Sequence, residues 1–149
     1  MRLALYQPDI PQNAGALIRL GACMGVGIDI IEPCGFLFSD AAFRRAAMDY
    51  RELAEVVRHA SWSAFLATCG TGRLVLLSAR STTAYTLVEF RAEDILLLGE
   101  SAGVPEAVRE RADVCVRIPM REGLRSLNVA QAGAMVLSEA LRQTSGFPL

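Results

Sequence analysis

The chain is 149 residues long, 52% of its residues are hydrophobic, and its formal net charge at pH 7 is −1. That length suits one domain with its own core, and the apolar content excludes a disordered chain and leaves surface for a second copy to cover. A charge near zero argues against broad, nonspecific binding of nucleic acids, and the absence of lysine excludes a P-loop and a pyridoxal Schiff base.

The first half of the chain alternates short apolar runs with segments of helical periodicity. The runs expected to be strands cover residues 2–6, 28–31 and 54–58. The segments expected to be helices cover residues 14–24, 40–47 and 61–69. Asn13 stands where the N-cap of the first helix belongs, and Gly25 and Gly27 end that helix.

The second half continues this alternation. Residues 74–77 and 95–98 are continuous apolar runs, as expected for strands covered on both faces, and residues 114–118 form a last strand. Helices are expected at residues 105–111 and 128–143, and the apolar face of the second is wide enough for a core or an interface. The pattern predicts a single α/β domain over residues 1–149 with a mostly parallel sheet, but it does not reveal the strand order.

Several classes of protein and site lack support in the sequence. No apolar run reaches the roughly 18 residues of a membrane span, and the N-terminus shows no signal-peptide pattern, so we expect a cytoplasmic protein that is not bound to a membrane. The four cysteines are scattered and the single histidine is His59. We therefore expect reduced thiols, and neither a disulfide framework nor a metal site.

The first polar patch in this apolar pattern runs from Pro11 to Arg19. Asn13 and Arg19 are six positions apart, so they are not stacked on one helix face. One interpretation is a capping asparagine and a surface arginine. The other follows from the apolar neighbours Ile18 and Leu20, which suit a partly buried arginine with an anionic partner.

The second patch is the glycine-rich turn at residues 99–105, Gly-Glu-Ser-Ala-Gly-Val-Pro, directly after the strand at residues 95–98. Open α/β sheets bind ligands at such turns, beyond the carboxyl ends of their strands. The turn lacks the Gly-x-Gly-x-x-Gly fingerprint of dinucleotide sites, so alone it is a weak signal.

The third patch runs from Arg117 to Gln131. Pro119 follows the last strand, Gly123 allows a sharp bend, and Asn128 with Gln131 has the spacing of a capping box. Capping of the last helix does not explain the four other residues crowded into this turn, which are Met120, Arg121, Arg125 and Ser126.

Together the three patches resemble a known family. The motifs Asn-x-Gly-x-x-x-Arg, Gly-Glu-x-x-Gly-x-Pro and Ile-Pro-Met-x-x-x-x-x-Ser-Leu-Asn occur in this order. The set resembles the SPOUT class of RNA ribose 2′-O-methyltransferases, and within it the small TrmL (YibK-like) family. That family methylates the wobble nucleotide, a cytidine or modified uridine, of certain tRNAs, with leucine tRNAs the expected substrates. Further matches at residues 30–36 and 44–50 extend the resemblance almost from end to end.

The resemblance implies a fold and a cofactor. The fold is a SPOUT domain, a mostly parallel sheet flanked by helices, with a trefoil knot near the C-terminus. The cofactor is S-adenosyl-L-methionine, which becomes S-adenosyl-L-homocysteine, and no metal takes part. Nine residues in three loops are implied to bind this cofactor: Leu77, Ser78, Ala79, Gly99, Gly103, Ile118, Met120, Ser126 and Leu127.

The resemblance also implies reactive groups and partners. Arg19 is assigned to the 2′-hydroxyl, and because a guanidinium stays protonated we expect it to stabilise alkoxide charge or grip a phosphate instead of taking a proton. Family members are homodimers in which the first and last helices meet, so that Arg19 reaches the partner's cofactor. The residues implied to position Arg19 and the ribose are Asn13, Glu100, Ser126 and Asn128. The candidates for tRNA phosphates, with solvated surface charge as the alternative, are Arg44, Arg45 and Arg121.

One departure from the family pattern keeps other interpretations open. The turn between Gly99 and Glu100 is one residue shorter than in similar proteins, which affects where Glu100 points. A knotted protein that binds S-adenosylmethionine and RNA but has lost catalysis is therefore the main alternative. An α/β enzyme that uses another nucleotide is disfavoured, because no phosphate-binding glycine fingerprint follows a strand.

Overall fold

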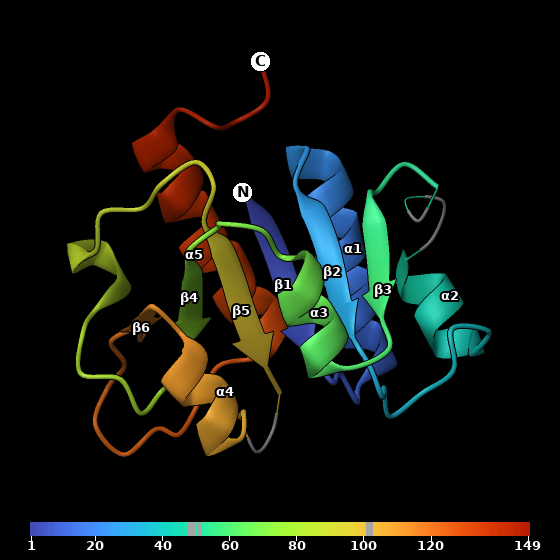
Figure 1. Ribbon diagram of the computed structural model, residues 1–149, viewed down its shortest axis with the longest axis horizontal. Helices are drawn as coiled ribbons and strands as arrows, with labels where there is room; N and C mark the ends of the chain where they lie inside the picture. Colours follow the sequence, from blue (N-terminus) through green and yellow to red (C-terminus); the bar gives the residue numbers. More distant parts are fainter. Residues whose placement is uncertain (48–49, 51, 101–102) are drawn as a thin grey trace.

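The computed structural model of the chain describes residues 1–47, 50, 52–100 and 103–149. Within these residues six strands form one sheet, and helices cover both of its faces (Figure 1). The strands are β1 (Arg2–Tyr6), β2 (Gly27–Ile31), β3 (Val56–His59), β4 (Leu74–Leu77), β5 (Ile95–Gly99) and β6 (Val114–Val116). The helices are α1 (Pro11–Met24), α2 (Ala41–Ala47), α3 (Trp62–Thr68), α4 (Glu106–Arg111), α5 (Val129–Thr144) and the 3-10 helix η2 (Tyr85–Leu87).

The strands of this sheet run parallel in the order β3-β2-β1-β5-β4-β6. Because β1 pairs with both β2 and β5, Tyr6 lies opposite Ile31 on one side and Gly99 on the other. The carboxyl ends of the strands therefore meet along one edge of the sheet, the lower edge in Figure 1. The predicted α/β fold with a parallel sheet is confirmed.

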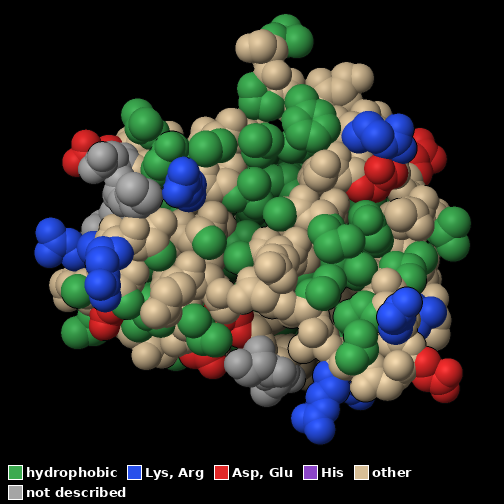
Figure 2. Space-filling model, turned by 180° about the vertical axis from the view of Figure 1, so that it is seen from behind, with side chains coloured by type: hydrophobic (Ala, Val, Ile, Leu, Met, Phe, Trp, Pro, Cys, Tyr) green, Lys and Arg blue, Asp and Glu red, His purple; other side chains and the backbone are tan. Residues whose placement is uncertain are grey.

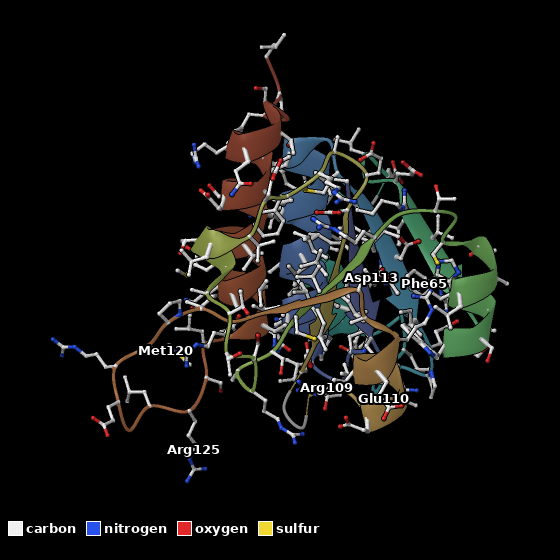
Figure 3. The ribbon with its side chains drawn as sticks, turned by 60° about the vertical axis from the view of Figure 1, so that its left-hand side comes forward. Phe65, Arg109, Glu110, Asp113, Met120 and Arg125 are labelled. Carbon is white, nitrogen blue, oxygen red and sulfur yellow. The ribbon has the colours of Figure 1, made fainter. Side chains whose placement is uncertain are left out.

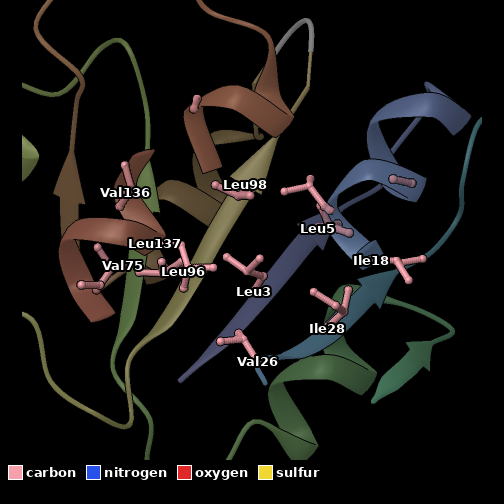
Figure 4. Packing of buried hydrophobic residues seen from close by; sticks show 14 of the residues in the cluster. Leu3, Leu5, Ile18, Val26, Ile28, Val75, Leu96, Leu98, Val136 and Leu137 are labelled. Carbon is pink, nitrogen blue, oxygen red and sulfur yellow. The ribbon is translucent and has the colours of Figure 1, made fainter. Parts of the chain in front are cut away.

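The two faces of the sheet carry separate hydrophobic clusters. Side chains alternate along a strand, so Leu3 and Leu5 pack with residues of α1 and α5, whereas Ala4 faces the cluster that includes Phe65 of α3 and Val108 of α4. Figure 4 shows the first cluster, in which side chains of β1 and β5 pack against α1 and α5. Each central strand is thus buried on both faces, which explains its continuous apolar sequence. None of the described helices combines the length and apolarity needed to cross a bilayer.

Two predicted strand boundaries are wrong. The strand expected at residues 54–58 is β3 at Val56–His59, because the amides of Leu53 and Ala54 bond to the carbonyl of Tyr50 in a turn, and because His59 is held in the sheet by Asp29 of β2, with its Nε2 2.8 Å from Oδ1. The strand expected at residues 114–118 ends at Val116, since Arg117 leaves β6 and bonds instead with the segment before β5.

The predicted start of the first helix is also wrong. Asn13 is not its N-cap, because α1 already begins at Pro11, and Ile10 occupies the cap position without a side-chain hydrogen bond. Proline is suited to the first turn of a helix because its φ is fixed and its missing N–H has no partner there. Asn13 therefore lies inside the first turn, buried, and its amide is available for a contact outside the helix.

Gly15 sets the distance between α1 and α2. A Cβ atom at this position would lie 2.4 Å from Cβ of Ala46 and 2.7 Å from the backbone nitrogen of Ala47. Both distances are shorter than side-chain contacts in real proteins, and the second involves backbone that cannot move aside cheaply. The close approach of these two helices thus depends on the missing side chain.

We predict that Gly15→Val lowers the free energy of unfolding by about 1–3 kcal/mol, the usual cost of overpacking a close contact. Ala16→Val is the matched control, because Ala16 is the exposed neighbour on the same helix. Urea denaturation of both variants measures the difference. Equal stability of the two variants would contradict the proposed packing of Gly15.

Candidate active site

A cavity of about 660 Å³ lies at the carboxyl edge of the sheet, between the ends of β4 and β5 and the start of α5. Three loops form its walls: the loop after β4, the turn after β5 and the segment that leads from β6 to α5. The volume falls in the range of sites for small molecules and cofactors, about 300–1,000 Å³. Its place beyond the carboxyl ends of parallel strands is where open α/β sheets bind ligands.

The cavity gathers the residues that the sequence singled out for a cofactor. All nine line it: Leu77, Ser78, Ala79, Gly99, Gly103, Ile118, Met120, Ser126 and Leu127. Three of the positioning candidates, Asn13, Glu100 and Asn128, line it as well. These groups are up to 115 positions apart in the sequence, and the parallel register of the sheet brings them to one edge.

Hydrogen bonds hold two of the three loops, the one after β4 and the segment after β6, against each other. The amide of Ser78 bonds to the carbonyl of Val116 at 2.8 Å, and Ser81 donates from its hydroxyl to the carbonyl of Cys115 at 2.8 Å. Further along, the amide of Arg117 bonds to the carbonyl of Thr83 at 2.8 Å. The segment after β6 is thus paired with the connection between β4 and β5, which fixes the cavity wall that both build.

Glu100 joins the turn after β5 to the start of α1. Its Oε2 accepts hydrogen bonds from the backbone amides of Asp9 at 3.2 Å and Ile10 at 2.9 Å, while Oε1 is buried without a hydrogen-bond partner among the described residues. Burial raises the pKa of Glu100 to about 7, and the neighbouring Asp9 carboxyl adds to this, although the two amide bonds act in the opposite direction. A carboxyl group with this pKa can exchange a proton near neutral pH.

Asn128 joins α5 to α1. Its Oδ1 accepts hydrogen bonds from the amides of Ala130 at 2.9 Å and Gln131 at 3.3 Å, so the predicted capping role is confirmed. Its Nδ2 donates to Oδ1 of Asn13 at 2.9 Å, across 115 positions of the sequence. One side chain therefore caps the last helix and fixes the first helix at the cavity.

Four other predicted residues lie away from the cavity. Arg19 is exposed on α1, which agrees with the surface interpretation and not with the partly buried one, and its guanidinium carbon lies 4.9 Å from the ring centre of Tyr50. Arg44 and Arg45 are exposed on α2, and Arg121 is exposed in the segment before α5. Within one chain, the structure therefore does not bring Arg19 to the other predicted site residues. Asp49 of the family pattern, and Ser101 and Ala102 of the turn, lie outside the described residues.

Nine residues that line the cavity were not predicted as site residues, and three of them are the arginines Arg80, Arg109 and Arg125. Arg125 belongs to the third polar patch, whereas no pattern in the sequence indicated Arg109, which precedes β6 on a short helix. In Figure 3 Arg109 lies on the side of α4 that faces the segment with Met120 and Arg125, whereas Glu110 lies further from it.

The cysteines do not build a metal centre in the structure. Cys23, Cys34, Cys69 and Cys115 are free thiols, and the described residues contain no cluster of three histidine, cysteine or acidic side chains suited to a metal ion. Burial and the nearby Glu32 carboxyl raise the pKa of Cys34 to about 11, which keeps that thiol protonated and unreactive at neutral pH.

Comparison with known proteins decides the family. The sequence profile of the SpoU rRNA Methylase family matches residues 1–138, which is most of the chain. This chain belongs to the SpoU rRNA Methylase family. Its similarity to family members covers the fold and the cavity together, since the matched region contains all three loops.

Similar proteins with curated names share one activity. A tRNA (cytidine(34)-2′-O)-methyltransferase of Ancylobacter novellus is 55% identical over 99% of this chain and 95% of its own length, and one of Beijerinckia indica is 60% identical over 95% and 90%. The protein of that name from Escherichia coli is 39% identical over 99% of this chain and 96% of its own length.

Solved structures agree with the fold. One described as giving structural insights into the 2-OH methylation of C/U34 on tRNA superposes with a TM-score of 0.93, at 41% identity, over 97% of this chain and 96% of that chain. The SpoU methyltransferase AviRb from Streptomyces viridochromogenes, in complex with the cofactor AdoMet, has a TM-score of 0.83 at 28% identity, over 96% of this chain and 60% of that chain.

We predict that the stability cost of the buried Glu100 carboxylate depends on pH. The folded state holds the proton of Glu100 up to about pH 7, whereas the ordinary value is 4.5, so the free energy of unfolding falls as pH rises through this window. Glu100→Gln has no such proton, and its stability relative to the wild type should increase from pH 5 to pH 8. Chemical denaturation at several pH values measures this difference, and a constant difference would contradict the burial of the charge.

Proposed function

We propose that this chain is a tRNA 2′-O-methyltransferase that transfers a methyl group from S-adenosylmethionine to the ribose of the wobble nucleotide, a cytidine or a modified uridine. The observation that carries the proposal is the single cavity that brings together all three expected cofactor loops. The similar proteins named for methylation of cytidine 34 support the choice of substrate. We propose residues 1–149 as one methyltransferase domain, leucine tRNAs as substrates, and the cytoplasm as the place of action.

The residues of the cavity fit S-adenosylmethionine. Leu77, Gly99, Ile118 and Met120 offer backbone groups and apolar side chains to an adenosine. Glu100 leaves a buried acceptor and Arg109 a buried donor without hydrogen-bond partners, which suits a ligand that carries both charges. When bound, this cofactor supplies a methyl group that is activated by a positively charged sulfur.

The residues of this chain have the task of aligning and activating the ribose. Alignment of two reactants lowers a barrier by roughly 7–11 kcal/mol in favourable cases. Asn13 and Asn128 fix the start of α1 and α5 beside the cavity, and Ser126 lies on the same wall. Glu100, with its pKa raised to about 7, is positioned on the cavity wall to hold a proton near neutral pH.

Arg19 acts in this proposal from a second subunit. It is absent from the cavity of its own chain, so it contributes to a site only if another copy presents it. Figure 2 shows the face of the sheet covered by α1 and α5, where hydrophobic side chains gather along the middle. On α5, Met135 is 41% exposed, and on α1 the residue Leu20 is half-buried. A homodimer formed through these helices would cover this surface and bring Arg19 to the partner's cavity.

In this proposal the RNA meets exposed arginines that lie outside the cavity. Arg44, Arg45 and Arg121 are exposed and suited to phosphate groups, since the guanidinium fork matches phosphate oxygens. The net charge of −1 means that this contact must be local. We also propose that the segment after β6, which is paired with the β4–β5 connection at Thr83 and Tyr85, passes through that connection to form the trefoil knot.

The test of the function is methyl transfer to RNA. The protein is incubated with radiolabelled S-adenosylmethionine and total tRNA, and the product is digested with alkali. We expect label in alkali-resistant dinucleotides that contain nucleotide 34, because 2′-O-methylation blocks cleavage there. Cofactor binding without transfer would favour a protein that has lost catalysis, and no cofactor binding would overturn the proposal.

We predict that Arg19→Lys lowers kcat for tRNA at least about 10-fold, because lysine keeps the charge but loses the forked donors. The affinity for S-adenosylhomocysteine should stay the same, since Arg19 contributes to the ribose and not to the cofactor pocket. Arg91→Lys is the control, because Arg91 is exposed before β5, at the opposite edge of the sheet. Near-normal turnover of Arg19→Lys would contradict the forked role.

A mixed dimer tests whether Arg19 acts across subunits. One chain carries Arg19→Ala and the other Gly99→Val, where a Cβ atom would lie 2.9 Å from Cγ1 of Val104 and distort the cavity turn. If Arg19 reaches the partner's cavity, the mixed dimer has one complete site and regains activity that neither homodimer shows. Absence of activity in the mixed dimer would place Arg19 with its own cavity.

A further inference from the structure

Arg109 is a cation built into the wall of the cavity. It comes from α4, and its Nη2 donates to Oγ of Ser78, in the loop after β4, at 2.6 Å. Its side chain is 19% exposed. Because Ser78 in turn bonds through its amide to Val116, the guanidinium is anchored to the sheet and cannot swing freely into solvent.

The guanidinium of Arg109 has donors that this chain does not use. Its Nε is buried without a hydrogen-bond partner, and Ser78 is the one side-chain hydrogen-bond partner of the guanidinium within the described part of the chain. The nearest carboxylate, Oε2 of Glu106, lies 3.9 Å from Nε, too far for a hydrogen bond, and Glu106 is 64% exposed. Glu106 therefore forms only a long, solvent-exposed ion pair with this half-buried cation, and an anionic ligand would supply the hydrogen bond that Nε lacks.

The position of Arg109 in the cavity indicates which kind of anion it would bind. The exposed arginines of the cavity mouth, Arg80 and Arg125, are open to an RNA backbone. Arg109 is less exposed than these two, and Ser78 holds it beside Leu77 and Ala79 of the cofactor loop. A carboxylate suits this place, because its two oxygens match two donors of the guanidinium fork.

We propose that Arg109 binds the carboxylate of the amino-acid end of S-adenosylmethionine and so orients that end of the cofactor against Ser78. This inference rests on the proposed function, since it names a further contact of the same cavity. Arg109 is a binding residue in this account, because it contacts the cofactor at a group remote from the methyl that is transferred. It adds a specific cationic contact to a site otherwise built largely from backbone groups and apolar side chains.

Calorimetric titration tests the proposal with two ligands that differ by one group. S-adenosylhomocysteine carries the carboxylate, and its decarboxylated analogue, S-adenosyl-3-thiopropylamine, lacks it. The wild type should bind the first about 10-fold more tightly than the second, the size expected for a charge-assisted hydrogen bond. Arg109→Gln should bind both ligands equally, with the affinity that the wild type has for the decarboxylated one, and Arg109→Lys should recover part of the preference.

Arg111→Gln is the matched control, because Arg111 lies on the same helix, is exposed, and faces Asp113 at 4.0 Å. It should keep the preference of the wild type. The proposal is overturned if Arg109→Gln still prefers S-adenosylhomocysteine, if it loses affinity for both ligands alike, or if it changes only the KM for tRNA, which would identify a phosphate contact. If the wild type methylates tRNA, the proposed function stands whichever of these results is obtained. If the wild type binds neither ligand, the proposed function is contradicted as well.

Discussion

The site depends on two side-chain contacts at the start of α1. Glu100, from the turn after β5, accepts hydrogen bonds from the amides of Asp9 and Ile10, and Asn128, from the start of α5, donates to Asn13. These contacts join three segments that the parallel sheet brings to one edge but does not itself fix in direction. Without them the ends of β4 and β5 would still form the floor of the cavity, but its walls would no longer be held in fixed positions relative to one another.

The buried polar groups of the site lower the stability of the fold and leave hydrogen-bonding atoms free for a ligand. Burial raises the pKa of Glu100 to about 7, so the ionised Glu100 side chain destabilises the fold at higher pH. Arg109 adds a buried donor without a hydrogen-bond partner on the same cavity. Groups that the isolated chain leaves unsatisfied are commonly satisfied by ligands, and here both line one cavity of cofactor size.

The sequence predicted the fold class because the central strands are buried on both faces and therefore read as apolar runs, such as Ile95–Gly99. It failed where a distant partner decides a local structure. Asn13 resembles a helix cap in sequence, but the helix begins earlier, at Pro11, and the side chain of Asn13 accepts a hydrogen bond from Asn128. For Arg19 the apolar neighbours left two interpretations open, and the structure supports the exposed one, since Ile18 is buried in the core and Arg19 is not.

The cavity residues were found through family motifs, because each loop alone carries only a weak signal. Arg109 was not predicted, because nothing in its own segment distinguishes it from Arg111, which lies on another face of the same short helix. Its partner, Ser78, lies 31 positions earlier, and only the pairing of β4 with β6 brings the two together. Contacts of this kind need strand order, which local pattern does not contain.

The most direct test of the account is the structure of the protein with S-adenosylhomocysteine bound. We expect the adenosine in the cavity, hydrogen-bonded to backbone groups of Leu77, Gly99, Ile118 and Met120, with Glu100 still bonded to the amides of Asp9 and Ile10. A ligand bound elsewhere on the chain would contradict the account. So would a ligand in the cavity with those amide bonds broken, since the walls would then not depend on them.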